Sequence, residues 1–101
     1  MEEIQNAIIQ SVEITNKDHD MLLVWINLKF KDYNQGFGGY ELYSPRFKIV
    51  HNKAGYFMYR LLQLADVHEW NQLKGKPIRV KSEGQQIIAL GHIVNDDWYC
   101  P

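Results

Sequence analysis

Residues 22–30 read Leu-Leu-Val-Trp-Ile-Asn-Leu-Lys-Phe, and this stretch carries the clearest strand pattern in the chain. Its apolar residues fall at every second position, at Leu22, Val24, Ile26, Leu28 and Phe30. Because successive side chains of a strand point to opposite faces, this spacing predicts a strand with one buried face. Residues 4–14 repeat the alternation, and the polar segment 16–20 between the two runs predicts an antiparallel hairpin.

Working outward, the segment 37–43 predicts a third strand that is entered through glycines and interrupted by Pro45. From about Ala54 the apolar period changes to that of a helix, which we expect to run to about Val67. Two further strands are expected, one beginning at residues 77–81 and a final long one over 85–94.

The order of these elements predicts an α+β fold. Strands cluster before and after one helix, without the regular alternation that builds a parallel sheet. We therefore expect an antiparallel, curved β-sheet of about five to six strands, with one main α-helix packed on one face. The 101 residues fit one domain, 1–101.

Composition excludes several classes of protein. The formal net charge is -1, with 11 basic and 12 acidic side chains, whereas proteins that bind nucleic acid through its phosphates usually carry a clear basic excess. General nucleic-acid binding is therefore disfavoured. A lone cysteine, Cys100, supports neither a disulfide framework nor a thiolate zinc site. The acidic start Met1-Glu2-Glu3 lacks the pattern of a signal peptide, so we expect a cytosolic protein.

The segment Gln35-Gly36-Phe37-Gly38-Gly39-Tyr40 is the most unusual feature of the sequence. Glycines allow positive φ and close approach of a ligand, and the flanking aromatic rings offer surfaces for stacking a nucleobase. The structural alternative is a hairpin with a β-bulge, which needs glycine for geometry alone. The segment lacks the Lys-Ser/Thr ending of a phosphate loop. The bulge is favoured, and ligand binding remains open.

Catalytic and metal-binding patterns are weak. No serine or cysteine lies in a nucleophile motif, so we expect no enzyme and no catalytic residue. Asp18, His19 and Asp20 offer metal-ligand atoms, but turn chemistry explains them better, and we expect neither metal nor cofactor.

Two surface features suggest binding. Arg79 and Lys81 alternate with buried-type residues and, with Lys74 and Lys76, predict a small positive stripe for one or two phosphates; a solvated strand face is the alternative. A second patch combines a helix face with the outer side of the strand at 22–30 and suggests self-association or a protein partner; its members are Tyr56, Tyr59, Arg60, Gln63, Leu23 and Trp25.

Taken together, the motifs resemble a widespread family of small phage and prophage proteins. The resemblance spans nearly the whole chain and is carried by the Gly36-Phe37-Gly38-Gly39-Tyr40 segment, by Ala89-x-Gly91-His92 and by Asp96-Asp97-Trp98-Tyr99. The pattern is also similar to the type 1 Thoeris anti-defence proteins, with which phages sequester cyclic ADP-ribose signals.

That resemblance implies a phage-encoded, homo-oligomeric sponge in the cytoplasm of an infected bacterium. Such a protein captures a cyclic nucleotide between aromatic side chains, clamps its phosphates with arginine and does no chemistry. The ligand-binding residues implied for this chain are Phe37, Gly38, Tyr40, Arg79, Asn95 and Trp98. Two other functions remain open. One is a protein inhibitor of a defence complex, similar to an anti-CRISPR, and the other is a phage accessory protein that binds single-stranded nucleic acid.

Overall fold

The computed structural model describes residues 2–17, 20–45 and 53–101 and confirms an α+β fold with a curved antiparallel sheet. Its elements are β1 (Glu2–Thr15), β2 (Leu22–Lys29), β3 (Asn34–Tyr43), α1 (Lys53–Leu64), the short 3-10 helix η1 (Trp70–Gln72), β4 (Pro77–Glu83), β5 (Gln86–Gly91) and β6 (Trp98–Tyr99). Among the described residues, no helix has the length and apolar character needed to cross a membrane.

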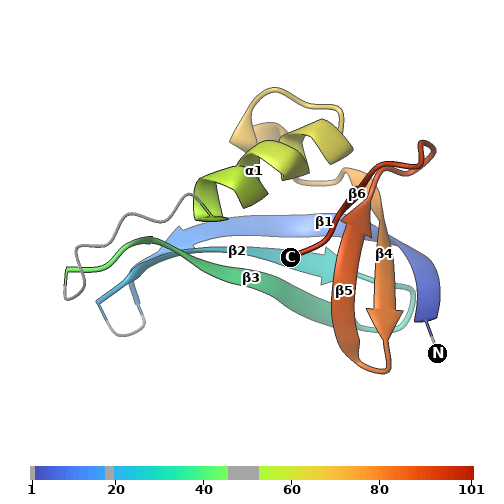
Figure 1. The fold of residues 1–101 in the computed structure, drawn as a ribbon, viewed down its shortest axis with the longest axis horizontal. Helices are drawn as coiled ribbons and strands as arrows, with labels where there is room; N and C mark the ends of the chain where they lie inside the picture. The colour runs from blue at the N-terminus through green and yellow to red at the C-terminus, as the bar shows by residue number, and fades with distance from the viewer. Residues whose placement is uncertain (1, 18–19, 46–52) are drawn as a thin grey trace.

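All neighbouring strands pair antiparallel, in the order β3-β2-β1-β4-β5-β6. The long strand β1 holds the sheet together, because Ile8–Thr15 pairs with β2 while Glu2–Ile8 pairs with β4. The β4–β5 hairpin crosses β2 and β3 at a steep angle (Figure 1). The sheet therefore curls into a half-barrel instead of lying flat.

Helix α1 lies over the inner face of this half-barrel (Figure 1) and contacts both outermost strands, β3 and β6. The hydroxyl of Tyr99 on β6 donates to the hydroxyl of Tyr40 on β3 at 3.0 Å. Burial and this hydrogen bond raise the pKa of Tyr99 above its ordinary value. Phe57 of α1 is fully buried at the centre, with the rings of Phe37, Tyr40 and Tyr99 around it.

The helix ends earlier than the periodicity predicts, at Leu64 instead of Val67. Asp66 takes a positive φ of 57°, the Val67 N–H donates to the Leu62 carbonyl, and the Asp66 N–H donates to Gln63. This is the Schellman arrangement that closes many helices, here with aspartate where glycine is usual. It turns the Asp66 side chain toward the loop that follows β5.

The last predicted strand is also wrong in its extent. β5 ends at Gly91, and residues 92–97 form a loop before the short strand β6. The loop begins because the His92 N–H bonds the Asp97 carbonyl at 2.9 Å and turns the chain back on itself. This loop positions most of the candidate site.

Candidate functional site

The outer face of the sheet carries an aromatic and cationic group of side chains near its β6 edge. Trp98 pairs with Gly91 across β5 and β6, and its indole lies so close that a Cβ on Gly91 would come within 2.6 Å of the ring. Arg79 Cζ lies 4.9 Å and Lys81 Nζ 4.6 Å from the centre of that ring. We call Arg79, Lys81 and Trp98 the outer-face cluster.

Strand alternation explains why these three side chains share a face. On β4 the side chains of Ile78 and Val80 are buried in the core, so Arg79 and Lys81 point outward. On β6 the ring of Tyr99 packs against Phe57 in the core, so its neighbour Trp98 points outward as well. Gly91 leaves room for the indole, which covers the backbone that glycine exposes.

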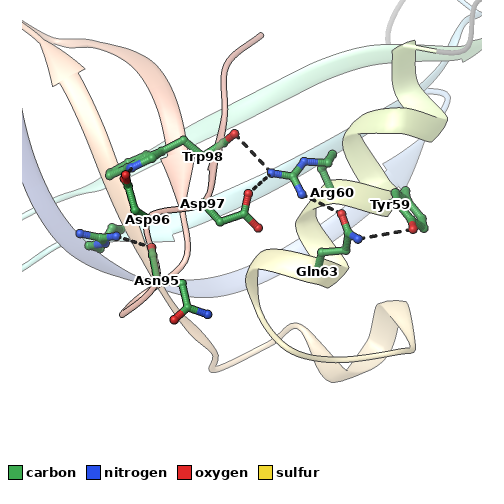
Figure 2. A network of polar contacts seen from close by, with 8 residues as sticks. Tyr59, Arg60, Gln63, Asn95, Asp96, Asp97 and Trp98 are labelled. Atoms are coloured by element: carbon green, nitrogen blue, oxygen red, sulfur yellow. Dashed lines mark hydrogen bonds and ion pairs between the residues drawn. The ribbon is translucent and has the colours of Figure 1, made fainter.

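Two arginines hold the 92–97 loop from opposite sides. Arg79 donates from Nε to the His92 carbonyl and from Nη2 to the Asn95 carbonyl, both at 2.6 Å. From α1, Arg60 donates to the Asp97 carboxylate at 2.6 Å and to the Trp98 carbonyl at 3.3 Å (Figure 2). The loop, and with it the position of Trp98, is therefore fixed by charge-assisted hydrogen bonds at both ends.

His92 adds a third support from inside the loop. Its Nδ1 accepts the backbone N–H groups of Val94 and Asn95, each at 3.0 Å. The proton of the neutral ring therefore sits on Nε2, which donates to Asp66 Oδ2 at 2.7 Å. Because both ring nitrogens are occupied, His92 serves the loop and is not placed as a free general base.

A polar groove of about 720 Å³ lies between the C-terminal part of α1 and the 92–97 loop. Its described lining consists of Tyr59, Leu62, Gln63, Asp66, Val67, His68, His92, Asn95 and Asp97. Hydrogen bonds already join Tyr59 to Gln63 and Gln63 to Arg60 (Figure 2). The groove presents acceptors and amides, and its described lining has no serine or cysteine nucleophile.

The six ligand-binding residues expected from the resemblance divide into two groups. Arg79, Asn95 and Trp98 come together, since the Arg79 guanidinium reaches both the Asn95 carbonyl and the indole. Phe37 and Tyr40 lie on the other face of the sheet, where they pack against the core. Gly38 lies in β3, where it pairs with Trp25 of β2, and belongs to neither group.

The glycine-rich segment forms the β-bulge that the sequence favoured. Val24 pairs with Tyr40 and Trp25 with Gly38, so Gly39 is the extra residue in β3. Gly38 and Gly39 both have positive φ, and a Cβ on Gly39 would meet the Trp25 ring at 2.8 Å. The two glycines are thus required by backbone geometry and by the tryptophan that covers them.

Lys81 belongs to the outer-face cluster but is not among the six expected ligand-binding residues. Its alternation with Val80 placed it beside Arg79, but the indole that brings both cations together comes from β6 and is not visible in the local pattern. The other two lysines of the expected stripe, Lys74 and Lys76, are exposed on the turn that leads into β4. Two of the four residues of the expected stripe, Arg79 and Lys81, therefore belong to the cluster.

In the structure, several members of the second surface patch are buried or already engaged in contacts. Tyr56 and Tyr59 are exposed on α1, whereas Arg60 is engaged with Asp97. Leu23 is buried instead of exposed. Trp25 is partly buried against the β3 glycines.

The Arg60–Asp97 pair predicts an acid-dependent stability. The hydrogen bond from Arg60 is the main reason that the pKa of Asp97 lies below its ordinary value of 3.8. A carboxylate with a lowered folded-state pKa stabilises the fold above its unfolded pKa, and the stabilisation disappears as the pH falls through the folded value. We expect Asp97→Asn to flatten the acid side of the curve of unfolding free energy against pH, as measured by urea titration.

The neighbouring Asp96 provides the control, because it accepts from the neutral Trp98 Nε1 at 2.9 Å and not from a cation. Asp96→Asn should keep the wild-type slope more closely than Asp97→Asn. Equal slopes for wild type and Asp97→Asn would contradict the pairing.

Metal binding gains no support from the described residues. They contain no group of three or more histidine, cysteine, aspartate or glutamate side chains placed to hold an ion. Asp18 and His19 lie outside the described residues. Chemically, the outer-face cluster offers one aromatic surface and two positive charges. No family model, curated protein or solved structure matches the chain.

Proposed function

We propose that the protein binds a small nucleotide and holds it without transforming it. The proposal rests on the outer-face cluster, a partly exposed indole with a guanidinium and an ammonium within 4.9 Å of its centre. A nucleotide combines a planar base with negatively charged phosphates. Base stacking on Trp98 and a phosphate contact to Lys81 would use both properties of the cluster together.

The motif resemblance makes a cyclic ADP-ribose signal the first ligand to test. On this proposal the chain is a phage-encoded anti-defence protein, acts in the cytoplasm of the infected bacterium and works as a homo-oligomer. Each site removes one molecule of signal. The amount of signal that the protein sequesters therefore depends on its affinity and concentration and not on turnover. The bound nucleotide leaves chemically unchanged when the protein is unfolded.

The residues have different roles in this proposal. Trp98 provides the stacking surface and Lys81 the positive charge that meets a phosphate. Arg79 is a positioning residue, because two of its nitrogens already bond carbonyls of the 92–97 loop. Phe37 and Tyr40 support the site from the core, through Phe57 and Tyr99, and do not contact the ligand.

Calorimetric titration with cyclic ADP-ribose isomers tests the proposal. The wild-type protein should bind one isomer tightly, and chromatography after denaturation should recover it intact. Removal of a base-stacking ring typically costs about 1–3 kcal/mol, so Trp98→Ala should weaken binding by about tenfold or more. Lys81→Met should also weaken binding, and more strongly at low salt.

Lys74→Met is the matched control, because Lys74 is an exposed lysine outside the cluster. It should leave the affinity unchanged. Consumption of the nucleotide over many turnovers would refute the proposal. If no nucleotide binds and a defence protein co-purifies instead, inhibition by protein contact takes its place.

One structural observation favours binding of single-stranded nucleic acid as a second candidate. β1 pairs with both β2 and β4, and α1 comes between β3 and β4, which is the strand order of OB-fold barrels. Within the described residues, β3 pairs only with β2, so the barrel stays open. In OB-folds the face of strands 2 and 3 binds oligonucleotides, and Trp25 lies on that face here.

The two candidates separate in one experiment. A single-strand binder should hold an oligothymidylate with strong salt dependence and bind it less tightly in Trp25→Ala. A nucleotide sponge should ignore the oligonucleotide and depend on Trp98.

A further inference from the structure

A second concave surface lies on β1, at the position where the strand stops pairing with β2 and begins to pair with β4. Ile8 pairs with Lys29, the last residue of β2, and also with Pro77, the first residue of β4. Toward the N-terminus, and within the described residues, Glu2–Ala7 pairs only with β4. The chain turns away after Lys29, so β2 no longer covers this side of β1.

The space left beside β1 is a groove of about 680 Å³. Its described lining is Asn6, Ala7, Ile8, Lys29, Phe30, Lys31, Pro77 and Ile93. Ala7 and Phe30 are buried and form its floor, while Ile8 keeps 40% of its surface exposed. The volume falls in the range of small-molecule sites, and the lining is mainly apolar, as it is in most such sites.

The charged residues in the described lining of this groove have one sign. Lys29 and Lys31 are exposed and line it, and none of its described lining residues carries a carboxylate. Within the described part of the chain, neither lysine is in an ion pair. Long lysine side chains lay their methylene groups along apolar surface and keep the ammonium in water. The groove therefore combines an apolar floor with two available positive charges.

We propose that this groove binds a small amphiphilic acid, meaning an aliphatic or aromatic body that ends in a carboxylate. The apolar body lies on Ala7, Ile8 and Phe30, and the carboxylate meets Lys29 and Lys31. Charge complementarity selects the anion, and the volume selects a small molecule over a protein segment. The groove has no residue in common with the outer-face cluster, so this inference does not depend on the proposed function.

Displacement of the fluorescent probe anilinonaphthalene sulfonate from the folded protein provides the test, because the probe is itself an aromatic anion. Decanoate should displace it, whereas decyltrimethylammonium, with the same chain length and the opposite charge, should not. A charge placed in the apolar floor should exclude the ligand, so Ile8→Glu should weaken probe binding by about tenfold or more. The double variant Lys29→Glu/Lys31→Glu should itself bind the anionic probe weakly, and direct calorimetric titration should show that it prefers decyltrimethylammonium over decanoate.

Ile4→Glu is the matched control, since Ile4 lies on the same strand and face, is 54% exposed and does not line the groove. It should bind the probe like the wild type. A measurement on the unmodified protein tests the site without relying on the folding of any variant. Decanoate should shift the NMR signals of the Ala7 methyl and the Phe30 ring and leave Ile14 unchanged.

Three results would overturn the proposal. The first is equal displacement by both amphiphiles, which removes the selection of an anion. The second is NMR shifts confined to residues outside the groove. The third is a stable dimer in which the groove is closed to the probe, because a second copy of the chain would then be its occupant. Trp98→Ala, which tests the nucleotide site, should leave probe displacement intact, so the two proposals can fail separately.

Discussion

Replacement of Phe57 by alanine should lower the free energy of unfolding by about 3–5 kcal/mol. Phe57 is 0% exposed, and its ring centre lies 5.9 Å from that of Phe37, 4.7 Å from Tyr40 and 5.7 Å from Tyr99. These partners come from β3 and β6, the two outermost strands of the sheet. The cavity would therefore open where the helix joins both ends of the half-barrel. Urea unfolding followed by circular dichroism measures the loss.

The neighbouring helix position supplies the control. Tyr56 is 55% exposed, and Tyr56→Ala should change the unfolding free energy by no more than about 1 kcal/mol. Phe57→Leu keeps most of the buried volume and should cost less than about 1.5 kcal/mol. Comparable losses for Phe57→Ala and Tyr56→Ala would show that α1 is not anchored through Phe57.

The regular elements could be predicted from sequence because their signals are local. Alternation at residues 22–30 identified β2, and helical spacing at Phe57, Leu61 and Leu64 identified the face of α1 that is buried. The order of strands around a single helix was enough to predict an antiparallel α+β fold. What failed were the ends of elements. The end of β5 depends on His92, whose bonds to Asp97, Val94 and Asn95 form only in the folded loop.

The candidate site could be predicted only in part, because it depends on which strands become neighbours. Alternation put Arg79 and Lys81 on one face. The pairing of Gly91 with both Arg79 and Trp98 is a property of strand register, and it brings the indole over the cations. Net charge gave no guidance here, since a balanced total says nothing of where the charges gather.

The aromatic residues around the glycines illustrate the limit most clearly. Phe37 and Tyr40 are three residues apart and would point to opposite faces of a regular strand. In the structure Phe37 pairs with Ile26 and Tyr40 with Val24, and both rings enter the core, because the bulge inserts one residue between them. Stacking surfaces expected for a ligand are therefore part of the packing around Phe57.

The β-bulge at Gly38 and Gly39 leads to a second prediction about stability. Gly38→Ala should lower the free energy of unfolding by more than about 2 kcal/mol, because alanine is strained at positive φ. Gly38 has a φ of 124°, and a Cβ there would come within 2.8 Å of the Val24 carbonyl oxygen. This neighbour is backbone, so it cannot rotate away as a side chain could. Relief requires β2 and β3 to separate locally.

Gly55→Ala adds the same methyl group at a position where the structure predicts a gain in the free energy of unfolding. Gly55 lies in α1, and a Cβ there would have no atom of the described residues within 4 Å. Alanine is favoured over glycine inside a helix, so this variant should gain about 0.5–1 kcal/mol. Because the two substitutions are chemically identical, their opposite effects in one urea-unfolding series would isolate backbone conformation as the cause. A mild effect at Gly38 would mean that Phe37 and Tyr40 reach the core by some arrangement other than this bulge, and that the glycines are free to serve a ligand.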